Sequence, residues 1–475
     1  MAEAATFDLA VLGAGPAGAS AAAEARRLGL SVLVLDQEGA AGGQVWRAAA
    51  ASMRETKASA EARAGNDLRA ALARSGAEAR FGRRVWSIQR DAEIWRLRTH
   101  GDAGAEVFGA RALALAAGAQ ERVLPVPGWT LPGVIGLAAA TALIKGQGVL
   151  PGRRVVFAGC GPLLPLAAHL AREGGAQVVA VVDLNGPADY ARRLPAILSR
   201  PDLALRGASW LAGLAASGAA ILTRHAVRRV EGDGRVERVI VGPVGADHGP
   251  DGAAAAERRF EADALCLGHG LIPATEASRM LGAAHVFDAA QGGWRPETDP
   301  CGRTSVPLLY AAGDGAGVQG AAAAPLRGVA AARAAAEDLG RAGAAQAPAG
   351  LARAARFGRA MTELSQPGPG LLAHADPGTI LCRCESLTRA EAEAELRDGA
   401  ASPAALKSGT RLGMGPCGGR FCAEAAARLA CEVLGTTREA LGPPSARPPI
   451  LPVPISALAE GFDYDELPMP QPAPL

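Results

Sequence analysis

The start of the chain alternates apolar runs with a helical pattern. The apolar run at 7–12 predicts a buried strand, and the alanine-rich segment 19–28 predicts a helix. A second apolar run at 31–35 predicts another strand, which ends at Asp36. A strand, a helix and a strand in this order indicate one βαβ unit of a parallel sheet.

The same alternation returns in the middle of the chain. A strand pattern at 154–159 leads through a turn and a helical segment to a second strand that ends at Asp183, and 192–216 predicts additional helix. The longest uncharged apolar run, 155–171, contains two glycines, two prolines and His169, so we expect strand, turn and helix rather than a membrane span. Two such units predict an α/β protein with two Rossmann-like domains.

The pattern changes in the last third of the chain. Residues 342–350 are rich in Ala, Gly and Pro and predict a linker, and 351–364 shows the periodicity of a short amphipathic helix. The end of the chain is proline-rich, so we expect neither a regular helix nor a central strand there. Its apolar side chains favour extended docking onto this chain or another: Ile450, Leu451, Val453 and Ile455.

Composition and charge exclude several classes of protein. The chain has 475 residues, enough for two or three domains, and its 49 basic and 47 acidic residues give a net charge of +2. This balance offers no broad field for nucleic acid or for an anionic membrane. The six residues before the first strand contain an acid and no Lys or Arg, so we expect no signal peptide and a cytoplasmic protein.

The first βαβ unit carries a dinucleotide-binding motif. Gly13 permits the tight turn, Gly15 lets the backbone approach a pyrophosphate, and Gly18 allows the helix to pack closely on the strand. Asp36 ends the second strand, where a carboxylate can accept the hydroxyls of an adenosine ribose. The motif itself serves both FAD and NAD.

The second unit is a degenerate copy of this motif. Gly159 and Gly161 are present, but Leu164 stands at the third glycine position and Pro165 follows it. A leucine there should push the helix away from the strand and disturb the phosphate site. The residues therefore leave open whether this unit binds NAD(P), and Asp183 would favour NAD over NADP.

Four of the eight cysteines form two close pairs near the C-terminus. A C-x-C pair and a C-x4-C pair can together supply four thiolates to one 2Fe-2S cluster, and the same four could hold zinc. Zinc knuckles usually space their cysteines as C-x2–4-C, so the C-x-C pair favours the cluster. The predicted ligands are Cys382, Cys384, Cys417 and Cys422.

The other cysteines do not form a redox pair. Segment 39–47, where disulfide reductases of this architecture can carry one, has no cysteine, and Cys160 stands alone in the second unit. We expect packing roles for Cys160 and for Cys431, and also for His269 near the expected flavin region. Scattered cysteines also fit a reducing compartment.

Two later segments resemble fingerprints of the two-dinucleotide-domain flavoproteins. Residues 113–119 and 309–314 look like the strands that follow the first motif in that family, and 42–44 resembles its loop beside the isoalloxazine. The resemblance implies FAD in the first site. It also implies further FAD-binding residues: Gly43, Gln44, Gly118, Gly313, Asp314 and Gly320.

The cysteine segments resemble a second family. Residues 379–385 and 409–422 are similar to the 2Fe-2S domain of the bacterioferritin-associated-ferredoxin type, which implies helices at 386–398 and 423–434 behind the ligand loops. Glycines of the second loop would let backbone amides reach the cluster sulfurs. Lys407 and Arg411 are expected to be surface charges, with compensation of the negative cluster or a partner surface as the alternatives.

The whole chain resembles the α subunits of hetero-oligomeric amine dehydrogenases, which include those of opine oxidase, hydrogen cyanide synthase and D-hydroxyproline dehydrogenase. The resemblance implies a partner β subunit of the flavin-dependent amine oxidase type, and it allows an additional FMN at a subunit interface and a small third subunit. In such complexes the β subunit oxidises a carbon–nitrogen bond and the α chain relays the electrons. Any membrane association would then be peripheral, at the inner membrane through the partners.

These patterns give a predicted domain order and competing functions. We expect a discontinuous FAD-binding domain at 1–120 and 265–340, an inserted NAD(P)-binding-like domain at 121–264, a linker and helix at 341–375, a small helical 2Fe-2S domain at 376–442 and a proline-rich tail at 443–475. The alternatives to an electron relay are a self-sufficient NAD(P)H-dependent reductase and a non-catalytic scaffold that binds zinc. The residues name neither the amine nor the final acceptor.

Overall fold

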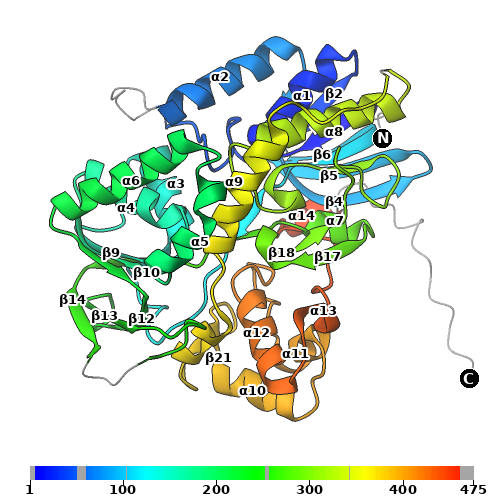
Figure 1. Ribbon diagram of the computed structural model, residues 1–475. Coiled ribbons are helices and arrows are strands. Elements are labelled where there is room, and N and C mark those ends of the chain that lie inside the picture. The colour runs from blue at the N-terminus through cyan, green and yellow to red at the C-terminus, as the bar shows by residue number, and fades with distance from the viewer. Residues whose placement is uncertain (1–5, 51–59, 103, 252–255, 342, 460–475) are drawn as a thin grey trace, which may run out of the picture.

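A computed structural model describes residues 6–50, 60–102, 104–251, 256–341 and 343–459. Figure 1 shows two α/β parts side by side, with a small helical part, coloured orange, below them. Residues 1–5 of the first predicted domain and 460–475 of the predicted tail lie outside the described residues. The predicted α/β class with two Rossmann-like parts and a small helical domain is confirmed.

The first part is built on a seven-stranded sheet. Its strand order is β3-β2-β1-β6-β5-β4. The strand β19 also pairs with β6, at residues 113–115, beyond the part of β6 that pairs with β5. β1, β2, β3, β6 and β19 are parallel, whereas β4, β5 and β6 form an antiparallel meander. The strands are β1 (Thr6–Leu12), β2 (Val32–Leu35), β3 (Glu78–Arg80), β4 (Arg84–Asp91), β5 (Ile94–Gly101), β6 (Gly104–Leu115) and β19 (Leu309–Ala311).

Small residues let helices pack closely on this sheet. α1 (Pro16–Arg27) and α8 (Ala324–Asp338) contact each other along alanine-rich faces, and α2 (Ala60–Ser75) lies beside them. A Cβ on Gly328 would lie 2.0 Å from the carbonyl oxygen of Ala17, so this crossing requires glycine. A turn at 321–323 precedes α8.

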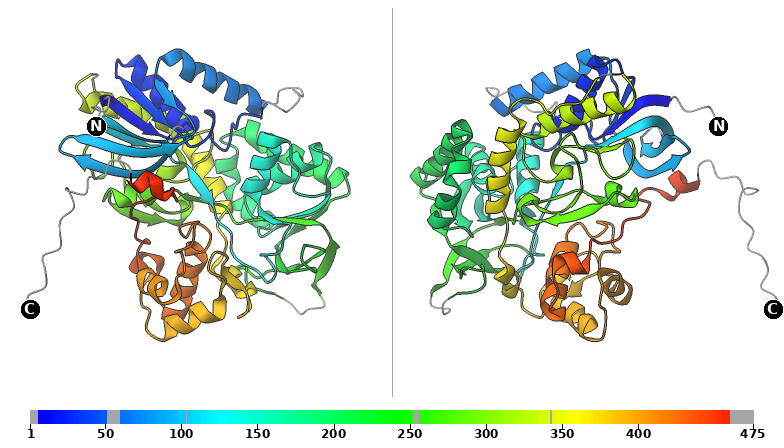
Figure 2. Two further views of the ribbon diagram at one scale, coloured as in Figure 1. Left: turned by 180° about the vertical axis from the view of Figure 1, so that it is seen from behind. Right: turned by 45° about the vertical axis from the view of Figure 1, so that its right-hand side comes forward.

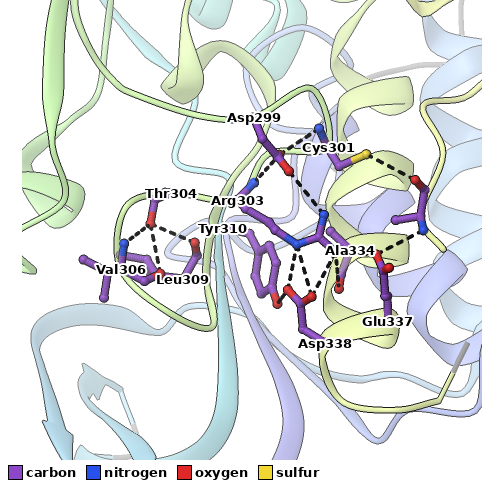
Figure 3. Close-up of polar contacts among 11 residues, drawn as sticks. Asp299, Cys301, Arg303, Thr304, Val306, Leu309, Tyr310, Ala334, Glu337 and Asp338 are labelled. Atoms are coloured by element: carbon purple, nitrogen blue, oxygen red, sulfur yellow. Dashed lines mark hydrogen bonds and ion pairs between the residues drawn. The ribbon is translucent and has the colours of Figure 1, made fainter. Parts of the chain in front are cut away.

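A partly exposed cluster of ion pairs joins the segment before β19 to α8 (Figure 3). Arg303 contacts Asp299 at 3.2 Å, Glu337 at 2.5 Å and Asp338 at 2.9 Å. Tyr310, in β19, donates its hydroxyl to Asp338 at 2.6 Å. The cluster therefore holds the strand that leads into the Gly-Asp fingerprint at 313–314.

The second part is a five-stranded parallel sheet of order β11-β10-β9-β15-β8. Its strands are β8 (Val134–Gly136), β9 (Arg154–Gly159), β10 (Gln177–Asp183), β11 (Ala220–Thr223) and β15 (Ala264–Gly268). Because β15 pairs with both β8 and β9, this sheet extends to residue 268, slightly beyond the boundary expected at 264. An antiparallel sheet of β12 (His225–Glu231), β13 (Arg238–Pro243) and β14 (Arg258–Glu261) adjoins it.

Helices cover the second sheet. They are α3 (Leu137–Gln147), α4 (Leu163–Glu173), α5 (Pro187–Ile197) and α6 (Pro201–Ala216). The additional helix expected at 192–216 is in fact two helices, because the chain turns at 198–200 and Pro201 begins a new helix. Two short antiparallel pairs connect the parts: β7 (Ala119–Glu121) with β16 (Leu271–Pro273), and β17 (His285–Asp288) with β18 (Gly293–Pro296), with α7 (Glu276–Met280) between them.

The C-terminal part begins with α9 (Leu351–Leu364), as the sequence predicts. The cysteine domain contains the hairpin β20 (Ile380–Cys382) and β21 (Leu387–Thr388), and the helices α10 (Arg389–Arg397), α11 (Pro403–Thr410), α12 (Ala423–Leu434) and α13 (Arg438–Leu441). The helix expected at 386–398 starts later because Leu387 and Thr388 pair with β20 and Thr388 caps α10. α12 has the predicted bounds.

The proline-rich segment runs from the cysteine domain back to the first sheet. The Ile450 amide donates to the Trp86 carbonyl oxygen in β4 at 2.8 Å, and Arg84 donates to the Pro452 carbonyl oxygen at 3.2 Å. Figure 2 shows the short helix α14 (Ile455–Ala459), in red, beside the strands of the first sheet. Extended docking on this chain is thus observed up to Pro454, whereas the expectation of no regular helix is wrong at α14, which begins at Ile455, directly after that proline. No helix in the described ranges is long and apolar enough to cross a membrane.

Candidate functional site

The first glycine-rich turn is packed too closely for any side chain. A Cβ on Gly13 would lie 2.5 Å from the Ala116 carbonyl oxygen, and one on Gly18 would lie 1.8 Å from the Gly13 carbonyl oxygen. Gly13 also has a φ of +102°. Gly15 is the N-cap of α1, so the free amides at that helix end face the position of a pyrophosphate.

Asp36 lies beside this turn. Its Oδ2 accepts the Ala14 amide at 2.5 Å and its Oδ1 accepts the Glu38 amide at 2.8 Å. Burial raises the pKa of this carboxyl, and the two amides oppose that shift. Each oxygen keeps a lone pair, so Asp36 can still accept hydrogen bonds from a ribose.

The loop after β2 folds back over the turn. The Gly42 amide donates to the Ala14 carbonyl oxygen at 2.9 Å, and a Cβ on Gly43 would lie 2.9 Å from the Gly15 Cα. Gln44 accepts a hydrogen bond from Arg47 at 2.7 Å. A cavity of about 260 Å³ opens here, lined by Glu38, Gly39, Ala40, Gly43, Arg47, Ala48 and Ala49.

The strands that carry the two later fingerprints end next to the first glycine turn. The Ala116 amide donates to Leu12 and the Ala312 amide to Leu115, at 2.8 and 2.9 Å, so three strand ends lie side by side. A Cβ on Gly315 would lie 3.2 Å from the Gly118 carbonyl oxygen. The first fingerprint and the two later ones, far apart in sequence, therefore form one cradle.

Asp314 is the charged group at the third fingerprint. Its Oδ1 accepts the amides of Gln319 and Gly320 at 2.9 and 2.8 Å. Burial raises the pKa of Asp314, and these amides together with the positive charge of Arg327 counteract it. Arg327 donates to three carbonyl oxygens of the same turn and so holds its shape: Gly313, Ala316 and Gly317.

The second glycine turn is covered by protein. A Cβ on Gly159 would lie 1.7 Å from the Gly268 carbonyl oxygen, and one on Gly161 would lie 1.9 Å from Ser365 Oγ. Ser365 is the C-cap of α9. The helix of this unit, α4, starts at Leu163, two residues after Gly161, whereas α1 starts directly after Gly15. The degenerate motif thus has a shifted helix and a packed turn.

Asp183 already accepts three hydrogen bonds within its own unit. Its Oδ1 accepts both the Asn185 amide and the Asn185 side chain, at 2.9 and 3.1 Å, and its Oδ2 accepts the Tyr190 hydroxyl at 2.6 Å. Burial raises the pKa of Asp183 to about 6, and Tyr190 and Asn185 act against this shift. Asn185 in turn donates to the Leu364 carbonyl oxygen at 2.8 Å, next to Ser365.

The four predicted ligand cysteines come together in the cysteine domain. The thiols of Cys384 and Cys417 are within hydrogen-bonding reach, as are those of Cys382 and Cys422. Cys382 and Cys422 are buried, whereas Cys384 is exposed. A Cβ on Gly415 would lie 2.2 Å from the Cys384 Cβ, so the second loop must carry glycine there.

The four thiols are arranged as two pairs, Cys384 with Cys417 and Cys382 with Cys422. Across the described ranges, no three Cys, His, Asp or Glu side chains are set as a site for a single metal ion. Two thiol pairs suit two irons that each bind two thiolates. Burial raises the pKa of the Cys422 thiol, so a bound cation is needed to hold it as a thiolate.

Comparisons with known proteins agree with both sites. The family model for pyridine nucleotide-disulphide oxidoreductases matches residues 7–338, and the BFD-like [2Fe-2S] binding domain matches residues 380–430.

The chain belongs to the pyridine nucleotide-disulphide oxidoreductase family.

Two relatives extend over nearly the whole length of this oxidoreductase, and a third over about three quarters of it. The A subunit of opine oxidase from Rhizobium meliloti (strain 1021) is 33% identical over 96% of this chain and 98% of its own length. Its counterpart from Agrobacterium tumefaciens is 34% identical over 95% and 91%. The hydrogen cyanide synthase subunit HcnB of Pseudomonas protegens is 36% identical over 73% and 74%. The predicted resemblance is confirmed.

Solved structures show the same fold. L-proline dehydrogenase from P. horikoshii superposes with a TM-score of 0.68 and 20% identity, covering 96% of this chain and 80% of its own. Thioredoxin reductase from Lactococcus lactis covers 71% of this chain with a TM-score of 0.51 and 18% identity. The cysteine domain is therefore an addition to a fold that thioredoxin reductases share.

The oxidoreductase binds FAD and a 2Fe-2S cluster, as its family and its cysteine domain indicate. The glycine cradle, Asp36 and Asp314 fit the first cofactor, and the two thiol pairs fit the second. When bound, the flavin exchanges two electrons and the cluster exchanges one at a time. The roles of the single residues in this binding remain our proposals.

Two residues of the oxidoreductase that the sequence does not single out lie between these sites. Arg122, just after β7, has its Nε 3.4 Å from Oε1 of Glu424 in α12. Neither residue stands in a motif, and both are buried charges whose partners are distant in sequence. The only sequence signal is an arginine in an otherwise apolar linker at 122–127.

Proposed function

We propose that this chain is the electron-transferring α subunit of a hetero-oligomeric amine or imino-acid dehydrogenase. A partner β subunit of the amine oxidase type oxidises the donor, which is an opine, D-hydroxyproline or a glycine-type substrate. The flavin and the 2Fe-2S cluster of this chain then accept those electrons and pass them singly to an acceptor. The names of its relatives, the A subunit of opine oxidase and HcnB of hydrogen cyanide synthase, support a subunit role.

The observation that carries this proposal is the contrast between the two nucleotide turns. At the first turn, Asp36 accepts one backbone amide on each carboxylate oxygen and keeps free lone pairs. The second has Ser365 packed on Gly161, and Tyr190 already bonded to Asp183. A chain that offers a flavin and a cluster but covers its second nucleotide turn needs another source of electrons. A partner subunit is the natural source.

The residues of this chain contribute binding and placement rather than proton transfer. Gly13, Gly15 and Gly18 let a pyrophosphate approach the backbone, and Asp36 and Asp314 orient the nucleotide through hydrogen bonds. The four thiolates hold two irons. No acid-base pair is needed here, because the partner oxidises the carbon–nitrogen bond to an imine and passes on only the electrons.

We also propose which surface of this chain would contribute to the additional FMN site at a subunit interface. A cavity of about 620 Å³ lies between the flavin domain, the second cysteine loop and the proline-rich segment. Its wall carries Arg279, Lys407 and Arg420, which suit a phosphate, and the glycines that flank Cys417. Acid extraction of the native complex should release FMN as well as FAD, and Arg279→Ala should lower the FMN content alone. Release of FAD only would contradict this placement.

Purification of the complex from its native host tests the proposed function. We expect a second flavoprotein subunit to co-purify with this chain, and the sample to be brown with absorbance from flavin and iron-sulfur. A homo-oligomer without such a subunit would favour the NAD(P)H-dependent reductase. A colourless, zinc-containing sample would favour the scaffold.

A further inference from the structure

Arg122 lies where the flavin domain meets the cysteine domain. It directly follows β7, which continues from Gly118 of the second flavin fingerprint, and only 2% of its surface is exposed. Burial lowers its pKa to about 10, so it remains a cation at neutral pH. A fully buried cation is costly unless its surroundings pair with it, so its contacts define its role.

The guanidinium of Arg122 joins four segments. Its terminal nitrogens donate to the Gly292 carbonyl oxygen at 2.7 Å, to Gln366 Oε1 at 2.8 Å and to the His269 carbonyl oxygen at 3.3 Å. Its Nε faces Glu424. The first three contacts lock the side chain in place, so the ion pair with Glu424 has a fixed position.

Glu424 lies in the first turn of α12, and the N-cap of that helix is the ligand Cys422. Its carboxylate also pairs with Arg428 at 3.1 Å and with Arg438 at 2.9 Å. Burial alone would raise the pKa of Glu424, but the three arginines hold it well below its usual range. Arg428 and Arg438 belong to the cysteine domain, and of the three arginines Arg122 alone comes from outside it.

We propose that Arg122 is a positioning residue for electron transfer: through Glu424 it holds the first turn of α12, and with it Cys422, at a fixed place relative to the flavin fingerprint at Gly118. The inference rests on the proposed relay function and goes beyond it. In that relay one electron passes from the reduced flavin to the cluster. The second follows after the cluster has given the first to an external one-electron acceptor.

Loss of Arg122 should loosen this placement without unfolding the cysteine domain. Glu424 would keep two arginine partners, so no buried carboxylate is left unpaired. Trp129 would still donate to the Ile380 carbonyl oxygen at 2.7 Å, and Arg420 would still pair with Glu276 at 3.3 Å. The cysteine domain would stay attached by these contacts, but with more freedom at α12.

The test compares Arg122→Met with a matched control in the full chain loaded with both cofactors. Arg389→Met is the control, because Arg389 is a partly buried arginine whose side chain contacts Leu372, Ala375 and acids of the cysteine domain. The flavin is photoreduced with a deazaflavin dye, and the rate of cluster reduction is followed by absorbance. Hydrogen exchange of the amides at 419–428 reports the placement of α12 independently of electron transfer.

We expect Arg122→Met to slow cluster reduction roughly 10- to 100-fold, the usual scale of a lost positioning contact. Amide exchange at 419–428 should rise, while flavin content, iron content and the EPR spectrum of the reduced cluster stay unchanged. Arg122→Lys keeps the buried cation but loses the planar guanidinium, so its rate of cluster reduction should lie between those of the wild type and Arg122→Met. It replaces Arg122→Met in the test if the methionine variant loses its cofactors. The control should match the wild type.

Two outcomes separate the positioning role from the relay function. If the wild-type flavin does not reduce the cluster at all, the relay itself is wrong. If the wild type transfers electrons and both Arg122 variants transfer them as fast, with unchanged amide exchange, the positioning role is wrong.

Discussion

Tyr190 donates its hydroxyl to Oδ2 of Asp183 at 2.6 Å. Asp183 stands at the end of β10, as Asp36 stands at the end of β2, but Asp36 bonds only to backbone amides. The second carboxylate is thus bonded by a tyrosine hydroxyl and an asparagine amide of its own unit. The two units share a topology and differ in what their carboxylates can still accept.

This difference predicts that the second unit does not bind nicotinamide nucleotides. Titration of the purified chain with NADH or NADPH, followed by tryptophan fluorescence or calorimetry, should show no binding, because Tyr190 occupies Asp183 and Ser365 packs on Gly161. Saturable binding of either nucleotide would contradict this prediction.

The cysteine site predicts a loss of iron that depends on which cysteine is changed. Cys417→Ala should abolish the cluster, because three thiolates cannot complete the ligation of two irons. Cys431→Ser is the matched control, since Cys431 lies in the same domain but outside the two thiol pairs. Iron and sulfide analysis, with EPR of the reduced protein, measures the effect. Equal iron content in both variants would refute Cys417 as a cluster ligand. Zinc in the wild-type protein would show that the site binds zinc instead of a cluster.

The close packing of the first glycine turn predicts that a single added methyl group, at Gly18, strongly affects FAD binding and stability. Gly18→Ala should reduce FAD content and lower the midpoint of thermal unfolding, because its Cβ would meet the Gly13 carbonyl oxygen. Gly207 lies in the middle of α6, where an added Cβ would have no atom within 4 Å. Gly207→Ala should therefore stabilise the protein by about 0.5–1 kcal/mol. Flavin absorbance per chain and a thermal melt measure both. Full FAD occupancy in Gly18→Ala would be incompatible with the close packing seen here.

Local patterns predict the elements and fingerprints because each depends on a few neighbouring residues. The strand–turn–helix at Gly13 and the proximity of Cys382 and Cys422, two predicted ligands, follow directly from spacing. Tertiary relationships are different: the cover that Ser365 places over Gly161 arises because α9 ends there. Likewise the break between α5 and α6 depends on a turn before Pro201 that the apolar pattern does not mark.

The Arg303 cluster predicts a salt-sensitive loss of stability. Arg303→Met would leave Asp299, Glu337 and Asp338 close together without their cation, near the strand that carries the third fingerprint. Because these groups are partly exposed, we expect a loss of about 1–2 kcal/mol that shrinks at high salt. Arg200→Met, which removes a local surface pair with Asp202, should change stability by less than about 0.5 kcal/mol. Similar losses in the two variants would contradict a structural role for the cluster.

His374 predicts a pH dependence below neutrality. Its Nδ1 lies 3.2 Å from the Arg228 guanidinium and its Nε2 lies 3.1 Å from the His248 carbonyl oxygen. Burial lowers the pKa of His374 from 6.5 to about 4, so the unfolded chain binds a proton before the folded one does.

Stability should therefore be constant above pH 6.5 with respect to this group and should fall between pH 6.5 and 4, by up to about 3 kcal/mol. Urea unfolding at several pH values measures the slope, and His374→Gln should flatten part of it. An unchanged slope in the variant would show that other groups cause the acid sensitivity.

The central claim is that electrons enter this chain from a partner subunit rather than from a nicotinamide nucleotide. It is tested most directly by anaerobic stopped-flow spectroscopy of the native complex, mixed in turn with an opine, D-hydroxyproline, glycine and NADH. We predict that one of the three nitrogen-containing donors reduces both the flavin and the cluster, and that NADH reduces neither. Rapid bleaching of the flavin by NADH, with no reduction by any of those donors, would contradict the account.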